Sequence, residues 1–227
     1  MTHRFDKKYP NLKGTVFIVT YGRSGSTLLQ NLLMTMPDTV IRGENHNVME
    51  CIWGAARRIR QTRFSWGAEP KGPEHPWHGA HEMRPVRFGA AMVDAFVDNV
   101  IVPPPSVRWM GFKEIRYNAL GDDFPMMLDF MHHHFKNARF IFNSRDRHDV
   151  VKSAWWRDWD QAKVFDLVNQ MDARFADYAQ RYPERAIQTN YADFCDDPRG
   201  LEPVFEWLGE PLEVDKTHKV LAQRLHH

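Results

Sequence analysis

One segment near the start of the chain restricts the possible folds more than any other. Residues 16–20 form a short apolar and β-branched run, which continues directly into Tyr21-Gly22-Arg23-Ser24-Gly25-Ser26-Thr27. Leucines then recur at positions 28, 29, 32 and 33, which is helical spacing. A strand that passes through a glycine-containing turn into a helix is typical of α/β domains with a parallel sheet.

The rest of the chain repeats this alternation of short apolar runs and longer helical patterns. The pattern predicts strands at residues 15–20, 39–41, 107–113, 138–143 and 186–190. It predicts helices at residues 26–36, 47–63, 86–100, 123–135, 148–156, 161–182 and 201–208. We therefore expect a single α/β domain over residues 1–227, with a P-loop-like central parallel sheet flanked by helices. Residues 64–85 read as a long loop, and we interpret residues 64–105 as an insertion.

Charge and composition limit the classes of partner. The chain is 43% hydrophobic and 26% charged, which is typical of a folded protein, and its 30 basic and 29 acidic residues leave a net charge of +1. This balance predicts no general attraction to nucleic acid or to acidic membranes, so bound anions must be held by locally arranged groups. Neither a signal peptide nor an apolar run of the roughly 20 residues that span a bilayer is recognisable. With only two cysteines, we expect a cytoplasmic protein that binds a small ligand, in an oligomeric state that the sequence leaves open.

The first loop has the properties of an anion site. Gly22 and Gly25 let the backbone approach a ligand, while the free amides at the helix start and the hydroxyls of Ser26 and Thr27 supply donors. A Walker A loop would carry a lysine after a four-residue spacer, whereas this shorter loop carries Arg23. The alternative is a tight turn in which Ser24 does no more than cap the helix.

A second candidate anion site follows the strand at residues 138–143. Arg145 leaves the strand end, and Ser153 lies eight positions further, which on a continuous helix is about two turns. Both side chains are then expected to reach one phosphate. In the alternative interpretation Arg145 pairs with Asp146 or Asp149, and Ser153 is solvated.

Taken together, these motifs resemble those of the PAPS-dependent sulfotransferases. Arg23-Ser24-Gly25-Ser26-Thr27-Leu28-Leu29 is similar to the loop that binds 5′-phosphosulfate in bacterial, carbohydrate and protein-tyrosine members, and cytosolic members usually have lysine in place of Arg23. The segment from Arg145 to Ser153 resembles the motif that binds the 3′-phosphate. A weaker match is Tyr191-Ala192-Asp193-Phe194 with Phe205-Glu206-Trp207-Leu208-Gly209.

The resemblance implies transfer of the sulfuryl group of PAPS to a hydroxyl or amine, with PAP as product and no metal. It favours a carbohydrate, glycolipid or other small molecule as acceptor. We interpret the insertion at residues 64–105 as lying on the acceptor side of the site. The residues it assigns to PAPS are Gly22, Arg23, Ser24, Gly25, Ser26, Thr27, Arg145, Ser153 and Tyr191. Two rival functions remain open: a nucleotide kinase-like enzyme, and a non-catalytic protein that binds PAP or PAPS.

Sulfuryl transfer needs a base on one side of the reacting group and cations on the other. Glu44 follows the second strand, and Gly43 frees the turn that aims it towards Arg23. Its separation from Arg23, 44 minus 23 or 21 residues, is similar to that of the proposed base in protein-tyrosine and bacterial glycolipid members. The alternative for Glu44 is an ion pair with Arg42 or a helix-capping role.

Lys113, at the end of the third strand, is the candidate cation for the leaving oxygen, assisted by Arg23. Lys113 could instead pair with Glu114 or Asp122. Cytosolic members have a catalytic histidine just beyond this lysine, whereas here Glu114 and Ile115 follow it, so Glu114 is the reserve base.

Three further patterns are weaker. His132-His133-His134 predicts no metal site, because consecutive helical residues point about 100° apart. Arg57, Arg58, Arg60 and Arg63 form either a surface for an acidic or sulfated acceptor or a solvated helix face. Trp53, Trp66 and Trp77 either stack on acceptor rings or belong to the core.

Overall fold

The computed structural model describes residues 3–153, 156 and 158–223 and is built on a five-stranded sheet. The strands are β1 (Gly14–Val19), β2 (Thr39–Arg42), β3 (Trp109–Glu114), β4 (Ala138–Ser144) and β5 (Ala186–Asn190). Their order is β2-β3-β1-β4-β5, and every neighbouring pair is parallel. The predicted P-loop-like α/β fold is confirmed, with β3 beginning two residues later than expected.

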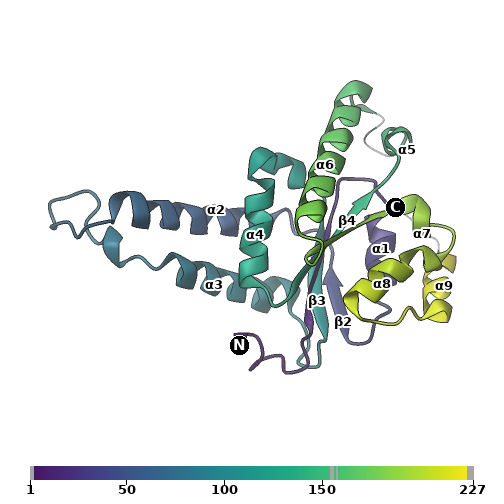
Figure 1. The fold of residues 1–227 in the computed structure, drawn as a ribbon, viewed down its shortest axis with the longest axis horizontal. Helices are drawn as coiled ribbons and strands as arrows, with labels where there is room; N and C mark the ends of the chain where they lie inside the picture. Colours follow the sequence, from purple (N-terminus) through teal and green to yellow (C-terminus); the bar gives the residue numbers. More distant parts are fainter. Residues whose placement is uncertain (1–2, 154–155, 157, 224–227) are drawn as a thin grey trace.

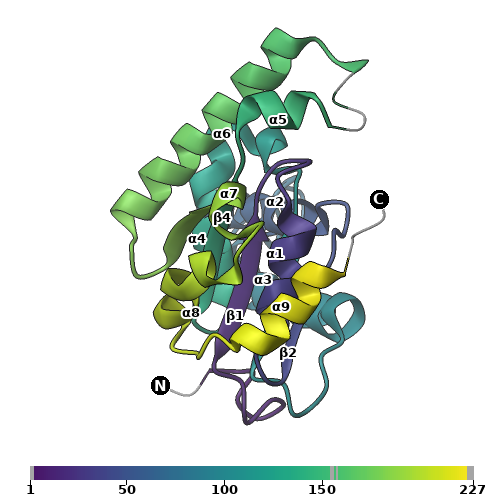
Figure 2. The same cartoon turned by 90° about the vertical axis from the view of Figure 1, so that its right-hand side faces the viewer.

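Alternate residues of the central strand face two different layers of helices, as the period of a strand requires. Val16 and Ile18 pack against α1 (Ser26–Leu33) and α8 (Glu202–Leu208). Phe17 and Val19 belong to the larger core cluster, which also takes in α4 (Phe124–His134) and α6 (Gln161–Arg181). Figure 2 shows β1 between α1 on one side and α4 on the other. The sheet is therefore covered on both faces.

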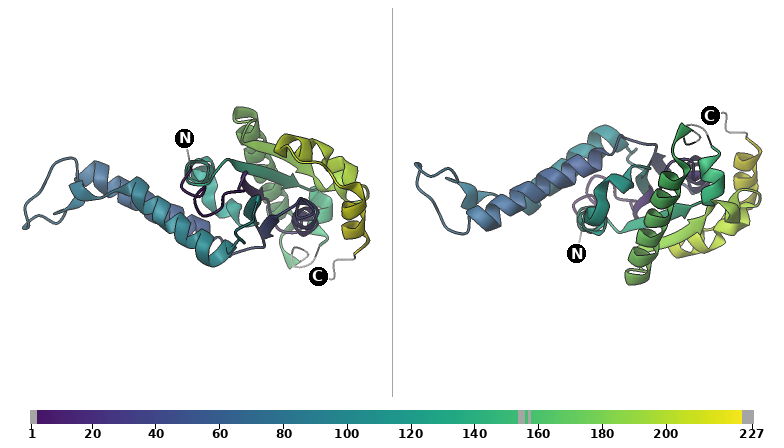
Figure 3. Two further views of the ribbon diagram at one scale, coloured as in Figure 1. Left: turned by 90° about the horizontal axis from the view of Figure 1, so that it is seen from below. Right: turned by 90° about the horizontal axis from the view of Figure 1, so that it is seen from above.

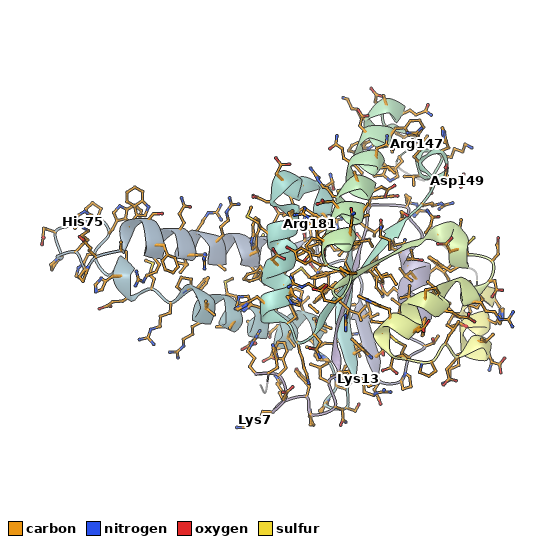
Figure 4. All side chains as sticks on the ribbon, viewed as in Figure 1. Lys7, Lys13, His75, Arg147, Asp149 and Arg181 are labelled. Atoms are coloured by element: carbon orange, nitrogen blue, oxygen red, sulfur yellow. The ribbon has the colours of Figure 1, made fainter. Side chains whose placement is uncertain are left out.

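A long helical hairpin leaves this body between β2 and β3. Its outward arm is α2 (Val48–Gln61), prolonged by a π-turn at Thr62–Trp66, and its return arm is α3 (Pro85–Phe96), prolonged at Val97–Ile101. Figures 1 and 3 show the two arms projecting together from the body, and Figure 4 labels His75 at the far end. We call residues 48–101 the hairpin.

The hairpin corrects one expectation. Residues 64–85 are not an irregular loop throughout, because the π-turn reaches Trp66 and a short 3-10 helix occupies Ala80–Glu82. The rings of Trp66 and Trp77 stack with their centroids 5.1 Å apart, which ties the two sides of the tip together. The position of residues 64–105 on the acceptor side stays a prediction.

The segment after β4 corrects a second expectation. In place of the helix predicted at residues 148–156, the structure has the short α5 (Arg147–Val151). Asp146 caps its start, because the Asp146 carboxylate accepts from the amides of His148 and Asp149. The amide of Ser153 bonds to the carbonyl of Val150 in the turn that follows. Ser153 therefore lies beyond the helix, and not two helical turns along it. Residues 154, 155 and 157 of the predicted helix lie outside the described residues.

The remaining elements are short. They are the 3-10 helix η4 (Tyr117–Asp123), α7 (Tyr191–Phe194), η6 (Pro198–Leu201) and α9 (Val214–Ala222), and none of the four was predicted as a helix. Only Thr217 of α9 is buried, and Val220 and Leu221 are partly buried against the core cluster next to α1 and α8. Within the described ranges, no helix is both long and apolar enough to cross a bilayer.

Candidate active site

The predicted motifs meet at the carboxyl edge of the sheet, where ligands of open α/β sheets bind. The chain runs from β1 to β2 on one side and then, through β3 and α4, to β4 on the other side of β1. The connections diverge at the end of β1, and the loop of residues 20–25 occupies that point. The parallel register places Arg42 opposite Phe112, so the residues that follow, Glu44 among them, come alongside the end of β3.

The first loop has a backbone that its glycines explain only in part. Gly25 adopts a left-handed φ of 80°, and a Cβ at this position would lie 2.0 Å from the ring of Tyr191. Glycine is therefore required at Gly25 both by conformation and by space. Arg23 is also left-handed, with a φ of 66°, which is uncommon for a residue with a side chain. Tyr191, at the start of α7, packs directly on the loop.

Polar groups at the ends of β1 and β4 form hydrogen bonds that hold the first loop in place. The Asn143 amide donates to the carbonyl of Ser24 at 2.8 Å. The hydroxyl of Thr20 lies 2.6 Å from the Asn143 carbonyl oxygen and 2.7 Å from the Ser24 hydroxyl. All three residues are fully buried, so these bonds are made in the absence of competing water. The interior of the sheet, and not the surface, sets the loop's position.

Arg145 joins the loop to the second anion motif. Its Nη1 donates to the carbonyl of Arg23 at 3.2 Å, and its guanidinium lies 4.4 Å from the centroid of the Tyr191 ring. Arg23 in turn donates from Nε to the hydroxyl of Ser153 at 2.9 Å. Neither carboxylate of the alternative interpretation, Asp146 or Asp149, forms an ion pair with Arg145. The structure thus brings Arg23, Arg145, Ser153 and Tyr191 together.

A buried tyrosine holds the backbone at Arg145. The Tyr21 hydroxyl accepts from the Arg145 amide at 2.9 Å and lies 3.1 Å from the Arg145 carbonyl oxygen, to which it donates. Burial raises the pKa of Tyr21 far above its ordinary value, so the phenol stays protonated and able to donate. On the other side of the loop, Trp156 donates from its indole to the carbonyl of Gly22 at 3.1 Å.

The candidate base and cation are in direct contact. Lys113 Nζ donates to Glu44 Oε1 at 2.7 Å, and Arg116 Nη1 donates to Glu44 Oε2 at 3.1 Å. The Glu44 side chain is 32% exposed, whereas that of Lys113 is 8% exposed. Partial burial raises the pKa of Glu44, but the two cations outweigh it and hold the pKa below its ordinary value. Glu44 pairs with neither Arg42 nor a helix end, and Lys113 with neither Glu114 nor Asp122.

The reserve base Glu114 has a different environment. Its side chain is fully buried, and its Oε2 accepts from the amides of Asn45 and Asn47 at 3.3 and 2.8 Å. Its Oε1 accepts from the amides of Ile115 and Arg116 and from the Arg116 side chain. His46 and Asn47 are left-handed, which turns the amides of the Glu44 loop inward towards this carboxylate. Glu114 thus anchors the loop that carries Glu44.

Several residues of this cluster were not foreseen in the sequence. Arg116, Asn143 and Thr20 carry no motif of their own, although each lies within two residues of the end of an observed strand. The histidine triplet forms the last three residues of α4, away from this cluster, and burial there lowers the pKa of His134 to about 4. Among the residues that the structure describes, no three His, Cys, Asp or Glu side chains are grouped as a metal would require.

Comparison with known proteins gives a consistent result. A model of the sulfotransferase family matches residues 15–214, which is most of the chain. The chain is also similar to the crystal structure of mouse sulfotransferase SULT7A1 complexed with PAP, at 13% identity and a TM-score of 0.46, covering 92% of this chain and 62% of that one. No curated protein sequence matches. On the strength of the family match, the chain belongs to the sulfotransferase family.

Proposed function

We propose that the protein is a PAPS-dependent sulfotransferase that uses Glu44 as its general base. One observation carries the proposal: Arg145 bonds to the backbone of Arg23, and Arg23 bonds to Ser153. The loop proposed for the 5′-phosphosulfate and the segment proposed for the 3′-phosphate therefore border a single site. A molecule with phosphates at both ends of one adenosine fits this arrangement.

The donor set suits PAPS. The amides and hydroxyls of residues 22–27 would hold the 5′ side, and Arg145 with Ser153 the 3′-phosphate. Within the described part of the chain, Arg145 Nε is a buried donor without a hydrogen-bond partner, which a phosphate oxygen would satisfy. Tyr191 lies under the guanidinium and restricts its direction. When bound, PAPS supplies the sulfuryl group that is transferred.

The polar cluster at β3 would supply acid–base chemistry. Glu44 takes the proton of the acceptor hydroxyl or amine, and Lys113 stabilises the negative charge that develops on the leaving oxygen. Because Lys113 depresses the pKa of Glu44, an ammonium drawn away to that oxygen would leave a stronger base behind. Glu114 positions the loop, because its oxygens accept from the backbone amides of Asn47 and Ile115.

For the acceptor we propose a chemical class and not a particular molecule. A carbohydrate, glycolipid or other small molecule with a free hydroxyl or amine suits a site whose base is one-third exposed at the protein surface. We likewise retain a cytoplasmic location as a prediction.

The test is product formation. The protein would be incubated with PAPS labelled in its sulfur and with sugars, glycolipids, phenols, amines and acidic peptides, and labelled products separated by chromatography. We expect a labelled product from at least one sugar, lipid or small molecule, together with PAP. Retention on immobilised ATP but not on PAP would favour the nucleotide kinase-like alternative. PAP binding without any sulfated product would favour the non-catalytic binder.

A further inference from the structure

A cavity lies away from the strand ends, between the two arms of the hairpin and α4. It has a volume of about 760 Å³ and is lined by α2, by the start of α3 and by α4. Figure 1 shows α4 lying across the two arms. Arg60, one of its lining residues, is 60 minus 48, or 12, residues beyond the first residue of α2, which at 1.5 Å per residue is roughly 18 Å along the helix. The cavity is therefore distinct from the site at Glu44.

Just over half of the residues that line this cavity are apolar, several of them are open to solvent, and the polar part of the lining includes His133 and His134. Phe64, Val86 and Met126 line it and are 60%, 58% and 47% exposed. Trp53 and Phe130 complete the apolar surface. Single exposed apolar side chains are ordinary, but large ones from three elements that converge on one concavity are typical of a ligand site. A volume between about 300 and 1,000 Å³ suits a small molecule.

The cavity has a positive charge at its edge that no acidic side chain among the described residues compensates. Arg57 lies over the ring of Trp53 and pairs with Asp123 at 2.5 Å, so its charge is compensated. Arg60 lies over the ring of Phe64, 5.2 Å from its centroid, and no carboxylate of the described residues pairs with it. Asp129, an acidic residue of the lining, accepts from Tyr178 and contacts Arg185 instead. Arg60 thus presents an uncompensated cation at the edge of an apolar cavity.

We propose that this cavity binds a small anionic amphiphile, a single molecule with an apolar chain or ring system and one acidic headgroup. The apolar part lies among Phe64, Val86 and Met126, and the headgroup pairs with Arg60. The inference concerns the hairpin alone and does not depend on the reaction proposed for the strand-end site.

The test is calorimetric titration of the protein with dodecanoate, at concentrations below those at which it forms micelles. We expect saturable one-to-one binding. Arg60→Gln should weaken it at least tenfold, because a charge-assisted hydrogen bond is lost. Arg58→Gln, on the same helix but outside the cavity lining, should change the affinity less than twofold and serves as the matched control. Met126→Asp, at an exposed position, should abolish binding by placing a carboxylate in the apolar part.

Two further titrations complete the experiment. Dodecyltrimethylammonium, with the same chain and the opposite charge, should bind at least tenfold more weakly than dodecanoate. Thermal unfolding of all three variants should match that of the wild type, which shows that each is folded whatever the fate of the proposed sulfotransferase activity. The proposal is overturned if dodecanoate does not saturate, or if Arg60→Gln and Arg58→Gln bind it equally.

Discussion

The two ends of the sheet hold the same kind of cluster in opposite settings. At the carboxyl end, Glu44 is paired with Lys113 and Arg116 and is 32% exposed. At the amino end, Glu210 is paired with Lys13 and Arg108, accepts from the indole of Trp109 at 2.9 Å, and is 2% exposed. Figure 4 labels Lys13 at this end and Arg147 at the other.

Glu44 and Glu210 have the same kind of charged partners, so their ion pairs alone do not distinguish a reactive carboxylate from a structural one. Their exposure to solvent does. Glu210 joins the residues before β1, the start of β3 and the chain after α8, so it links segments that are distant in sequence. Glu44 sits on a loop held from beneath by Glu114, with one side open to an incoming molecule. We therefore expect substitutions at the carboxyl end to affect turnover and ligand binding, and those at the amino end to affect stability.

The largest effect is expected at Glu44. Glu44→Gln should lower turnover at least tenfold, and a general base typically contributes ~10²–10⁴. PAP affinity should not change, and the free energy of unfolding should fall by no more than about 1 kcal/mol, because glutamine keeps an oxygen acceptor for Lys113. Steady-state rates with the acceptor found in the product assay, together with urea unfolding, provide the measurement. Turnover at the wild-type level would transfer the role to Glu114.

The next effect separates the two ends by ligand binding. Arg145→Ala should weaken PAP binding by about 1.5–3 kcal/mol, the value of a charge-assisted hydrogen bond. Arg108→Ala removes an arginine of comparable partial burial at the amino end and is the matched control, for which PAP affinity should be unchanged. Calorimetric titration with PAP measures both. Equal affinities of the two variants would contradict the assignment of Arg145.

The third effect is on stability. Glu210→Gln should lower the free energy of unfolding by about 1–2 kcal/mol. A broken buried pair costs ~3–5 kcal/mol, but Lys13 is 44% exposed and Arg108 27% exposed, so solvent screens much of the interaction. Turnover at a temperature well below unfolding should match that of the wild type. A rate loss comparable to that of Glu44→Gln would remove the distinction between the two ends.

The sequence revealed one end of the sheet far better than the other, for a physical reason. The loop at Gly22–Thr27 and the segment from Arg145 follow strands directly, so local spacing alone brought them to one edge. The Glu210 cluster has no local pattern, because Lys13, Arg108 and Glu210 meet only once the chain has folded. The contact between Arg23 and Ser153 was missed for a related reason, since it depends on the left-handed Arg23 and on the early end of α5.

The smallest expected effect is the pH dependence of the amino-end cluster. Burial raises the pKa of Glu210, but Lys13, Trp109 and Arg108 outweigh it, so the folded-state pKa lies below the ordinary value of 4.5. A depressed pKa contributes stability that is complete above the unfolded pKa and is lost as the pH falls towards the folded one. The difference in unfolding free energy between wild type and Glu210→Gln should therefore be constant from about pH 5.5 to 7, because this range begins about one unit above the unfolded-state pKa. The difference should shrink below about pH 4.5. A difference that is independent of pH down to about 3 would mean that Glu210 stabilises the fold through its shape and hydrogen bonds, and not through its charge.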